Sequence, residues 1–375
     1  MAAIYFHVPF CKQACHYCNF HFSTSLKHKN PVLDAMLSEL KLRKEELVET
    51  EKINSIYFGG GTPSLLSSAE ISVLIHEVKR NFNVAVDAEI TLEMNPDDDR
   101  PDYLEELKTI GVNRLSVGIQ SFHETDLVAM NRAHSAYQAK KCLDLATRYF
   151  DNITIDLMFG MPTMSMDLWR ENLQIAFGFG IKHLSCYAMT VEPQTALEHF
   201  IKKGSHPPLD DELAANHFKV LIEEALKDGF IHYETCSFGK SDYFSKHNTS
   251  YWLGKPYLGV GPSAHSFNGK KRSWNISNNS SYIRSLEASI LPSESEILSI
   301  EDTFNEYIMT GLRTMWGVSL KKIETEYGLK MKEQLIENTT ELVKSDFLVI
   351  EDHYIKITPT GKFLSDGIAS KLFLV

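Results

Sequence analysis

The sequence predicts a parallel α/β fold followed by a smaller α+β domain. Over roughly the first two thirds of the 375 residues, apolar runs of strand length alternate with amphipathic helical patterns, as in folds built from repeated strand–helix units. Polar residues gather where the predicted strands end, which is the edge where parallel α/β folds place their chemistry. The pattern is compatible with a barrel, a partial barrel or a doubly wound sheet.

Six apolar runs have the length and composition of buried parallel strands. They are Ile4–Phe10, Ile53–Phe58, Ala88–Met94, Arg114–Ile119, Ile153–Phe159 and His183–Val191. The helical patterns between them are Val32–Glu49, Ser68–Asn81, Pro101–Thr109, Ala136–Phe150 and Met166–Phe177. The polar residues at or near the strand ends are Gly59 to Pro63, Glu93, Gln120 and Asp156.

The alternation weakens after Asp210. A helix is predicted at Glu212–Asp228 and a strand at Phe230–Phe238, whereas the Gly-, Ser- and Asn-rich stretch Lys240–Ser281 is predicted to form long loops. The segment Leu291–Ser299, which holds a proline and three serines, is a candidate boundary. We therefore predict an α/β domain at 1–238, a loop-rich connecting region at 239–295 and a C-terminal domain at 296–375.

Three helical patterns and a hairpin predict a winged-helix-like module in the C-terminal domain. The helices are predicted near Asp302–Met315, Leu320–Tyr327 and Met331–Ser345, and the hairpin strands at Phe347–Glu351 and Tyr354–Thr358. Over residues 300–375, nine Lys and Arg stand against twelve Asp and Glu, a net charge of −3. This charge favours a packing or partner role over DNA binding.

The whole-chain charge and hydropathy exclude further classes of partner. Lys and Arg number 38 and Asp and Glu 49, so the net charge is −11, which argues against nucleic-acid binding through phosphates. No apolar run has the roughly 18 residues that a membrane span needs. The segment Met1–Phe10 lacks the basic flank of a secretory signal. We expect a cytosolic protein.

Three of the six cysteines, Cys11, Cys15 and Cys18, fall within eight residues. Thiolates spaced C-x3-C-x2-C can bind three irons of a cubane cluster and leave the fourth iron open, whereas fully ligated clusters use four cysteines. The alternative is a zinc site in which His7, His16 or His21 supplies the fourth ligand. The isolated Cys142, Cys186 and Cys236 are expected to be small buried apolar groups.

Five segments together resemble the radical S-adenosylmethionine (SAM) superfamily. They are His7 to Cys18, Gly59 to Pro63, Gly118 to Phe122, Asn131 to His134 and Asp156 to Pro162. Their order is similar to that in the branch containing oxygen-independent coproporphyrinogen III dehydrogenase and a related family of heme chaperones. The resemblance runs from Ile4 into the C-terminal domain, and it implies a partial (β/α)6 barrel with a smaller C-terminal domain.

The resemblance also implies a cofactor set and its ligands. A [4Fe-4S] cluster would be held by Cys11, Cys15 and Cys18, and the amino and carboxylate groups of SAM would chelate the open iron. The implied SAM contacts are Tyr5, Tyr17, Gly60, Gly61, Thr62, Glu93, Gln120, Arg132 and Asp156. Glycine allows backbone N–H groups to approach an anion closely. Taken singly, a Glu or Asp after a strand can equally be a helix cap or an ion-pair partner.

Two departures from the dehydrogenase pattern favour the chaperone branch. The dehydrogenase has a further cysteine two residues after the third ligand, where this chain has Phe20. The dehydrogenase also carries an N-terminal extension that helps to enclose its tetrapyrrole, whereas this sequence reaches Cys11 almost at once. Radical decarboxylation needs an enclosed site.

His247 to Trp252 matches the H-N-x-x-Y-W pattern of the chaperone branch. A neutral imidazole is a common axial ligand of heme iron, so His247 is a candidate heme ligand and His265 a weaker one. The alternative is a structural histidine near the barrel mouth, with Tyr251 and Trp252 filling the core.

The resulting hypothesis is a heme chaperone that binds heme and passes it to acceptor proteins, such as respiratory, membrane-associated heme enzymes. The cluster and SAM would regulate this transfer or the assembly, which could include a homodimer. The enzyme alternatives are the dehydrogenase itself or another radical SAM oxidoreductase. A binding module that holds zinc is the third class.

Overall fold

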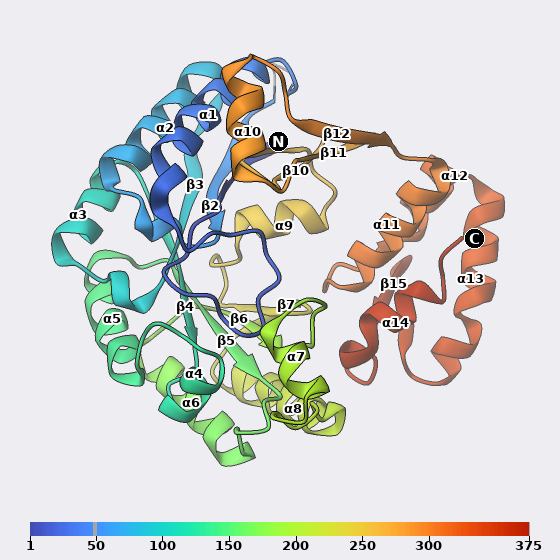
Figure 1. Ribbon diagram of the computed structural model, residues 1–375. Coiled ribbons are helices and arrows are strands. Elements are labelled where there is room, and N and C mark those ends of the chain that lie inside the picture. Colours follow the sequence, from blue (N-terminus) through green and yellow to red (C-terminus); the bar gives the residue numbers. More distant parts are fainter. Residues whose placement is uncertain (48–50, 375) are drawn as a thin grey trace.

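A twelve-stranded sheet forms the centre of the computed structural model, which describes residues 1–47 and 51–374 (Figure 1). Seven neighbouring strands of this sheet run parallel, in the order β9-β1-β2-β3-β4-β5-β6. Their bounds are β1 Ala2–Val8, β2 Ile53–Gly60, β3 Val84–Met94, β4 Arg114–Gln120, β5 Ile153–Phe159, β6 His183–Ala188 and β9 Tyr257–Val260. The six predicted strands are therefore confirmed as β1 to β6, in a curved sheet that forms a partial barrel.

Two of the predicted strands end earlier than expected. β1 stops at Val8 because Pro9 has no N–H for the sheet and the chain then turns, with the Phe10 N–H donating to the Val8 carbonyl at 2.9 Å. β6 stops at Ala188, three residues before the predicted Val191. Both strands end where the chain enters a loop that carries residues of the candidate site.

Helices cover the outer face of the parallel strands (Figure 1). They are α1 Lys29–Leu42, α2 Ser68–Asn81, α3 Pro101–Thr109, α5 Ala136–Tyr149, α6 Met166–Gly178 and α8 Asp211–Lys227. The short helices α4 Glu124–Ala129 and α7 Ala196–Lys202 lie in the loops after β4 and β6. Reciprocal hydrogen bonds between Ser67 and Glu70 start α2 as a capping box. The predicted helix Val32–Glu49 ends earlier, at Leu42, and residues 48 and 49 lie outside the described residues.

The expectation of long loops at Lys240–Ser281 is wrong. This stretch contains α9 Lys246–Trp252, β9, β10 His265–Phe267, β11 Lys271–Asn275 and the start of α10 Asn279–Glu287. β9 pairs in parallel with β1, and β10, β11 and β12 (Ser293–Ile297) extend the sheet in antiparallel fashion. The strands have three to five residues, and several positions are polar or glycine, so no apolar run marks them. The predicted strand Phe230–Phe238 is likewise a hairpin of β7 Ile231–Glu234 and β8 Ser237–Gly239.

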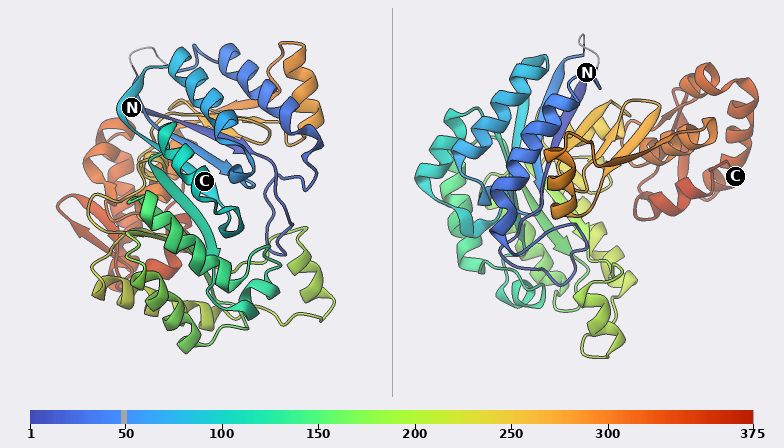
Figure 2. Two further views of the ribbon diagram at one scale, coloured as in Figure 1. Left: turned by 90° about the vertical axis from the view of Figure 1, so that its left-hand side faces the viewer. Right: turned by 45° about the horizontal axis from the view of Figure 1, so that its top comes forward.

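The C-terminal part of the chain is a winged-helix-like domain with its own core. Its elements are α11 Ile300–Leu312, β13 Val318–Ser319, α12 Leu320–Tyr327, α13 Leu329–Lys344, β14 Leu348–Glu351, β15 Tyr354–Ile357 and α14 Ser365–Ser370. The antiparallel sheet has the order β13-β15-β14. Its buried apolar side chains, from Phe304 to Leu372, form a cluster separate from that of the barrel. Figure 2 shows the domain beside the barrel, beyond the paired strands β11 and β12.

Backbone hydrogen bonds join the C-terminal domain to the β7–β8 hairpin. The Thr235 N–H donates to the Arg313 carbonyl at 2.9 Å, and the Met315 N–H donates to the Tyr233 carbonyl at 3.0 Å. The Arg313 guanidinium also lies 5.1 Å from the ring centre of Trp252 on α9. In the described part of the chain, no helix is both long and apolar enough to cross a membrane.

Candidate functional site

Residues 9–25, which we call the cluster loop, connect β1 to the 3-10 turn η1 (Leu26–His28) and carry the three clustered cysteines. In Figure 1 the loop, in dark blue, crosses the open side of the barrel. The loop closes on itself, since the Cys11 N–H donates to the Ser23 carbonyl at 3.1 Å and the Ser23 N–H donates to the Pro9 carbonyl at 2.9 Å. This closure fixes the base from which Cys11 projects.

The segment after α4 holds the middle of the cluster loop. Gln13 donates through Nε2 to the side chain and carbonyl of Asn131, at 2.9 and 3.0 Å, and Asn131 Nδ2 donates to the Ala14 carbonyl at 2.7 Å. Lys12 forms ion pairs with Asp97, at 2.7 Å, and with Asp98. The loop is therefore tied, just before Cys15, to the segments that follow β3 and α4.

Cys11, Cys15 and Cys18 line one cavity of about 860 Å³, bounded by the barrel and the C-terminal domain. All three are free thiols and partly exposed. Burial raises the pKa of the Cys11 thiol to about 11 and raises that of Cys18 as well. Bound iron would favour the thiolates and oppose this effect of burial.

Among the described residues, no group of three His, Cys, Asp or Glu side chains is arranged to hold a single metal ion. A cubane places each of its three cysteine ligands on a different iron, so its ligands need not converge on one point. The three thiols on one cavity wall therefore provide a donor set that fits a cubane with one open iron.

The glycines after β2 lie against the cluster loop. A Cβ on Gly61 would sit 2.5 Å from the Phe10 carbonyl oxygen, and a Cβ on Gly60 (φ +109°) would meet the His7 ring at 2.7 Å. The Gly61 N–H donates to the Val8 carbonyl, at 2.9 Å, and the Thr62 N–H to the Phe10 carbonyl, at 2.6 Å. The N–H groups of Gly61 and Thr62 are therefore already occupied and, contrary to the expectation, do not face an anion. Gly60, Gly61 and Thr62 do line the cavity.

Two carboxyl groups, Glu93 at the end of β3 and Asp156 within β5, lie on the barrel side of the cavity. Burial and then the neighbouring Asp156 raise the pKa of Glu93 to about 7, although the Tyr57 hydroxyl donates to it at 2.8 Å. Burial raises the pKa of Asp156 to about 6, opposed by Arg114 and Arg132. Such carboxyls favour a cationic ligand, because a positive charge would stabilise both ionised forms.

Arg132 connects the cluster loop to the strand ends. Its guanidinium donates to Cys15 Sγ at 3.3 Å, to the Tyr17 hydroxyl at 3.5 Å, to Asn95 Oδ1 at 2.9 Å and to the Gly118 carbonyl at 3.0 Å. Gln120 lies on the same cavity wall, with a left-handed backbone φ of 66° at a bulge of β4. The structure thus brings together all three cysteines and every predicted SAM residue except Tyr5.

Tyr5 and the two histidine candidates lie outside the residues that line this cavity. Tyr5 packs beside Tyr57 inside the barrel, and its hydroxyl lies 3.3 Å from His7 Nδ1. His247, in the first turn of α9, is 1% exposed, and its Nδ1 and Nε2 share hydrogen bonds with Ser55 (2.9 Å) and the Tyr251 hydroxyl (2.7 Å). Burial lowers the pKa of His247 to about 3, so its ring is neutral. His265 is exposed at the start of β10.

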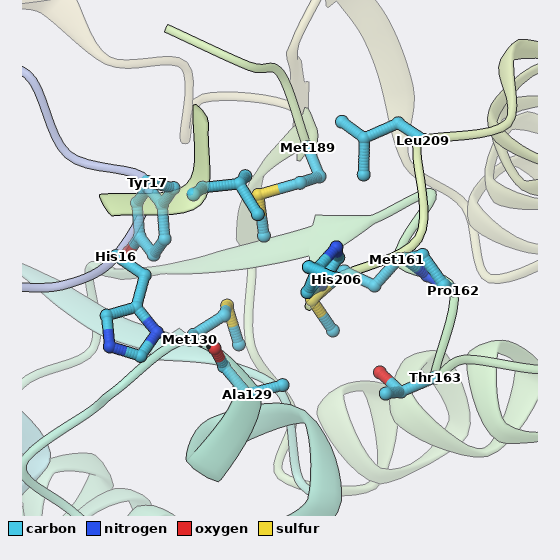
Figure 3. Close-up of a pocket in the computed structure, with 11 residues that line it drawn as sticks. His16, Tyr17, Ala129, Met130, Met161, Pro162, Thr163, Met189, His206 and Leu209 are labelled. Atoms are coloured by element: carbon cyan, nitrogen blue, oxygen red, sulfur yellow. Dashed lines mark hydrogen bonds between the residues drawn. The ribbon is translucent and has the colours of Figure 1, made fainter. Parts of the chain in front are cut away.

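A second, much smaller pocket lies behind Tyr17 and His16 of the cluster loop (Figure 3). Met130, Met161 and Met189 line it, and its volume is about 20 Å³. That volume holds about one water molecule. The pocket therefore supports the packing of the cluster loop, and a macrocycle does not fit in it.

Several residues that line the cavity were not predicted from the sequence. Asn95 could have been found, because it follows Glu93 at the end of β3. Arg313 and Lys362 could not, because they come from the C-terminal domain and reach the cavity only through the docking of that domain. Neither belongs to a pattern that marks it in the sequence.

The fold and the site define a radical SAM protein. Residues 5–176 match the family model of the radical SAM superfamily, and residues 298–364 match that of the HemN C-terminal domain. The HemN coproporphyrinogen III oxidase from Escherichia coli, a radical SAM enzyme, has the same fold: the TM-score is 0.85 at 23% identity, over 99% of this chain and 90% of HemN.

Curated relatives narrow the assignment. The heme chaperone HemW of Bacillus subtilis is 30% identical over 98% of both chains, and HemW of Lactococcus lactis subsp. lactis is 29% identical over 99% of this chain and 97% of its own. The chain belongs to the HemW family.

Proposed function

We propose that this protein binds heme and transfers it to acceptor proteins. The observation that carries the proposal is the full-length similarity to heme chaperones, joined to a cavity beside the three cysteines. Its volume of about 860 Å³ lies within the range of small-molecule and cofactor sites. Aromatic side chains from both domains line it, together with two methionines of the barrel, and such side chains can pack on a porphyrin face.

The same cavity supports a cluster and SAM. Cys11, Cys15 and Cys18 would hold a [4Fe-4S] cluster, whose open iron can bind and activate a small molecule. Glu93 and Asp156 supply carboxylates for the ammonium and ribose hydroxyls of SAM, and Arg132 supplies a guanidinium for its carboxylate. Because Arg132 also donates to Cys15 Sγ, ligand binding at Arg132 would be coupled to the cluster. This coupling is our proposed route by which SAM regulates heme transfer.

The second candidate is coproporphyrinogen III dehydrogenase activity, which the fold match to HemN favours. Against it stands Phe20, at the position where the dehydrogenase pattern has its further cysteine. Phe20 lines the cavity and is 68% exposed. An apolar side chain here removes a thiol that the dehydrogenase pattern retains.

The test uses full-length protein reconstituted with iron and sulfide without oxygen. Hemin is titrated first, and the loaded protein is then mixed with an apo heme protein whose own spectrum reports transfer. In parallel, coproporphyrinogen III is supplied with SAM and a reductant. Stoichiometric hemin binding followed by transfer is the expected result. Steady formation of protoporphyrinogen would overturn the chaperone proposal, and failure to bind hemin would do so as well.

A further inference from the structure

The charges that line the cavity are divided between its two sides. On the barrel side are the cysteines with Glu93 and Asp156, and the nearest cation, Arg132, already donates to four partners. On the side of the C-terminal domain are Lys362, Arg313 and Asp366, so this side carries a net charge of +1. An anionic group entering the cavity is therefore repelled by the first side and attracted by the second.

Lys362 has no ion-pair partner among the described residues. Its Nζ donates to His232 Nδ1 at 2.9 Å, and His232 Nε2 is hydrogen-bonded to the Thr235 carbonyl at 3.2 Å. This carbonyl can only accept, so Nε2 carries the proton and His232 is neutral. The Lys362 ammonium thus has two N–H donors left for a ligand, and no carboxylate in the described part of the chain pairs with its charge. Burial lowers the pKa of Lys362, and a bound anion would oppose this effect.

Arg313 lies at the end of α11, next to the hairpin that joins the two domains. Its Nη1 donates to both carboxylate oxygens of Asp366, at 2.6 and 2.7 Å, and Asp366 is itself on the cavity wall. The guanidinium is held over Trp252, and its buried Nε lacks a partner in the described structure. Arg313 is therefore fixed at this side of the cavity with part of its donor set unused.

Three neighbouring aromatic side chains line the cavity between its two sides; Phe159 and Phe218 are largely buried and Phe363 is exposed. The ring centres of Phe159 (β5) and Phe218 (α8) are 6.1 Å apart, and those of Phe218 and Phe363 are 5.6 Å apart. Phe363 directly follows Lys362. All three rings line the cavity. A flat apolar ligand that carries anionic groups along one edge could pack against these aromatic side chains and pair its anions with Lys362 and Arg313.

We propose that Lys362 and Arg313 bind the propionate carboxylates of heme, with the macrocycle against Phe159, Phe218 and Phe363. The inference rests on the proposed function and adds the orientation of the ligand: propionates toward the C-terminal domain and the opposite edge toward the cluster loop. The recognised chemistry is a carboxylate pair on a porphyrin edge.

The test compares hemin with hemin dimethyl ester, in which both carboxylates are neutralised. Full-length protein and the Lys362→Met variant are titrated with each ligand by absorbance. Lys356→Met, on β15 of the same domain and away from the cavity lining, is the matched control. Lys362→Met should bind hemin about tenfold or more weakly, the loss expected for a charged hydrogen bond. It should bind the dimethyl ester as the unchanged protein does, and Lys362→Arg should restore hemin binding.

The unchanged protein gives a test that does not depend on the folding of a variant. It should bind hemin about tenfold or more tightly than the dimethyl ester. Equal affinity for the two ligands, or hemin binding by Lys362→Met at full strength, would overturn the propionate assignment while the chaperone proposal stands. A protein that binds neither ligand would refute the chaperone proposal and with it this inference.

Discussion

Glu93 and Asp156 are carboxyl groups whose ionised forms are destabilised by burial in the protein without ligand. Since the folded structure raises the pKa of Glu93 from 4.5 to about 7, its contribution to stability is present below pH 4.5 and is lost as the pH rises through 7. At pH 8 the buried carboxylate therefore destabilises the protein without ligand.

Glu93→Gln should stabilise the cofactor-free protein at pH 8 by about 2 kcal/mol and much less at pH 5.5. Thermal unfolding at the two pH values measures this difference. Glu192→Gln, which removes a partly exposed carboxylate of the same cavity, is the control and should change neither value appreciably. A loss of stability at pH 8 would mean that Glu93 is held by partners that compensate its charge.

SAM binding should weaken as the pH falls from 8 to 5.5. The cationic groups of SAM favour the ionised forms of Glu93 and Asp156, whose pKa values are about 7 and about 6. Calorimetric titration of the reconstituted protein across this range measures the effect. In Glu93→Gln the affinity should be lower and its pH dependence should move toward the lower pKa of Asp156. A flat profile in the unchanged protein would contradict the assignment of these carboxylates.

Cys11→Ala, Cys15→Ala and Cys18→Ala should each lose most of the iron and labile sulfide after reconstitution. Each removes one of three thiolates, and no other protein ligand is proposed for the cubane. Cys142→Ala, which alters a buried cysteine of α5 far from the cavity lining, should keep the cluster. If one cluster variant retained full iron, the remaining histidines of the loop would become the candidate ligands.

At the residue scale, the sequence was informative where the motif is local. Cys11, Cys15 and Cys18 come from one loop, and their spacing alone predicts a shared site, whereas Tyr17 was expected there from the family resemblance. The physical role of Gly61 could not be predicted, because its cause is the close approach of Phe10, which follows β1. The cations of the C-terminal domain depend on domain docking, which no local pattern encodes.

Among the elements, α9 differs most from the prediction, because it is a helix in a stretch that was expected to form loops. It packs against β1 and β2, and the Lys246 and His247 N–H groups at its start donate to the Glu89 carboxylate, both at 3.1 Å. Both ring nitrogens of His247 already have partners within the protein. For His247 to bind heme iron, as proposed from its motif, at least one of these bonds must break and α9 must move.

His247→Ala should lower stability by about 2 kcal/mol, because it leaves a cavity and takes a partner from the buried Ser55. Urea unfolding measures this change, and His265→Ala, at an exposed position, is the control and should be close to neutral. The hemin spectrum of the folded His247→Ala variant tests the iron-ligand role. An unchanged spectrum and stoichiometry would remove that role and leave a structural one.

Element prediction succeeded for β1 to β6 and failed for β9 to β11, for one physical reason. The parallel strands β1 to β6 are buried on both faces and carry long apolar runs, whereas β10 and β11 are short and partly exposed. Their strand conformation depends on pairing with β9, which in turn depends on β1. Such pairing is a property of the assembled sheet and not of the segment.

For the whole molecule, we propose a boundary near residue 296 and assign residues 239–295 to the barrel. The side chains of Tyr282, Ile283 and Leu286 on α10 belong to the barrel core, and β12 is the edge strand of its sheet. The second core begins at Phe304. The cavity is therefore built between two separately packed bodies.

Heme binding should slow hydrogen exchange in both bodies at once. The cavity is lined by Thr235 and Cys236 of the β7–β8 hairpin and by Lys362 to Asp366 of the C-terminal domain. A ligand that contacts both should oppose their local opening. Exchange mass spectrometry with and without hemin should show protection in peptides covering 232–239 and 360–366, and none in α13, which lines no part of the cavity. Protection confined to the barrel would contradict a shared cavity.

The pairing of β1 with β9 also affects how the chain acquires its structure during synthesis. The strand that leads into the cysteine loop lies between β2 and a strand more than 240 residues further along the chain. Chains emerge from the ribosome N-terminus first, and distant pairings form late. The first strand must therefore wait for about two thirds of the polypeptide to be translated before its second neighbour is available. Until then the three thiols remain on an incompletely supported segment.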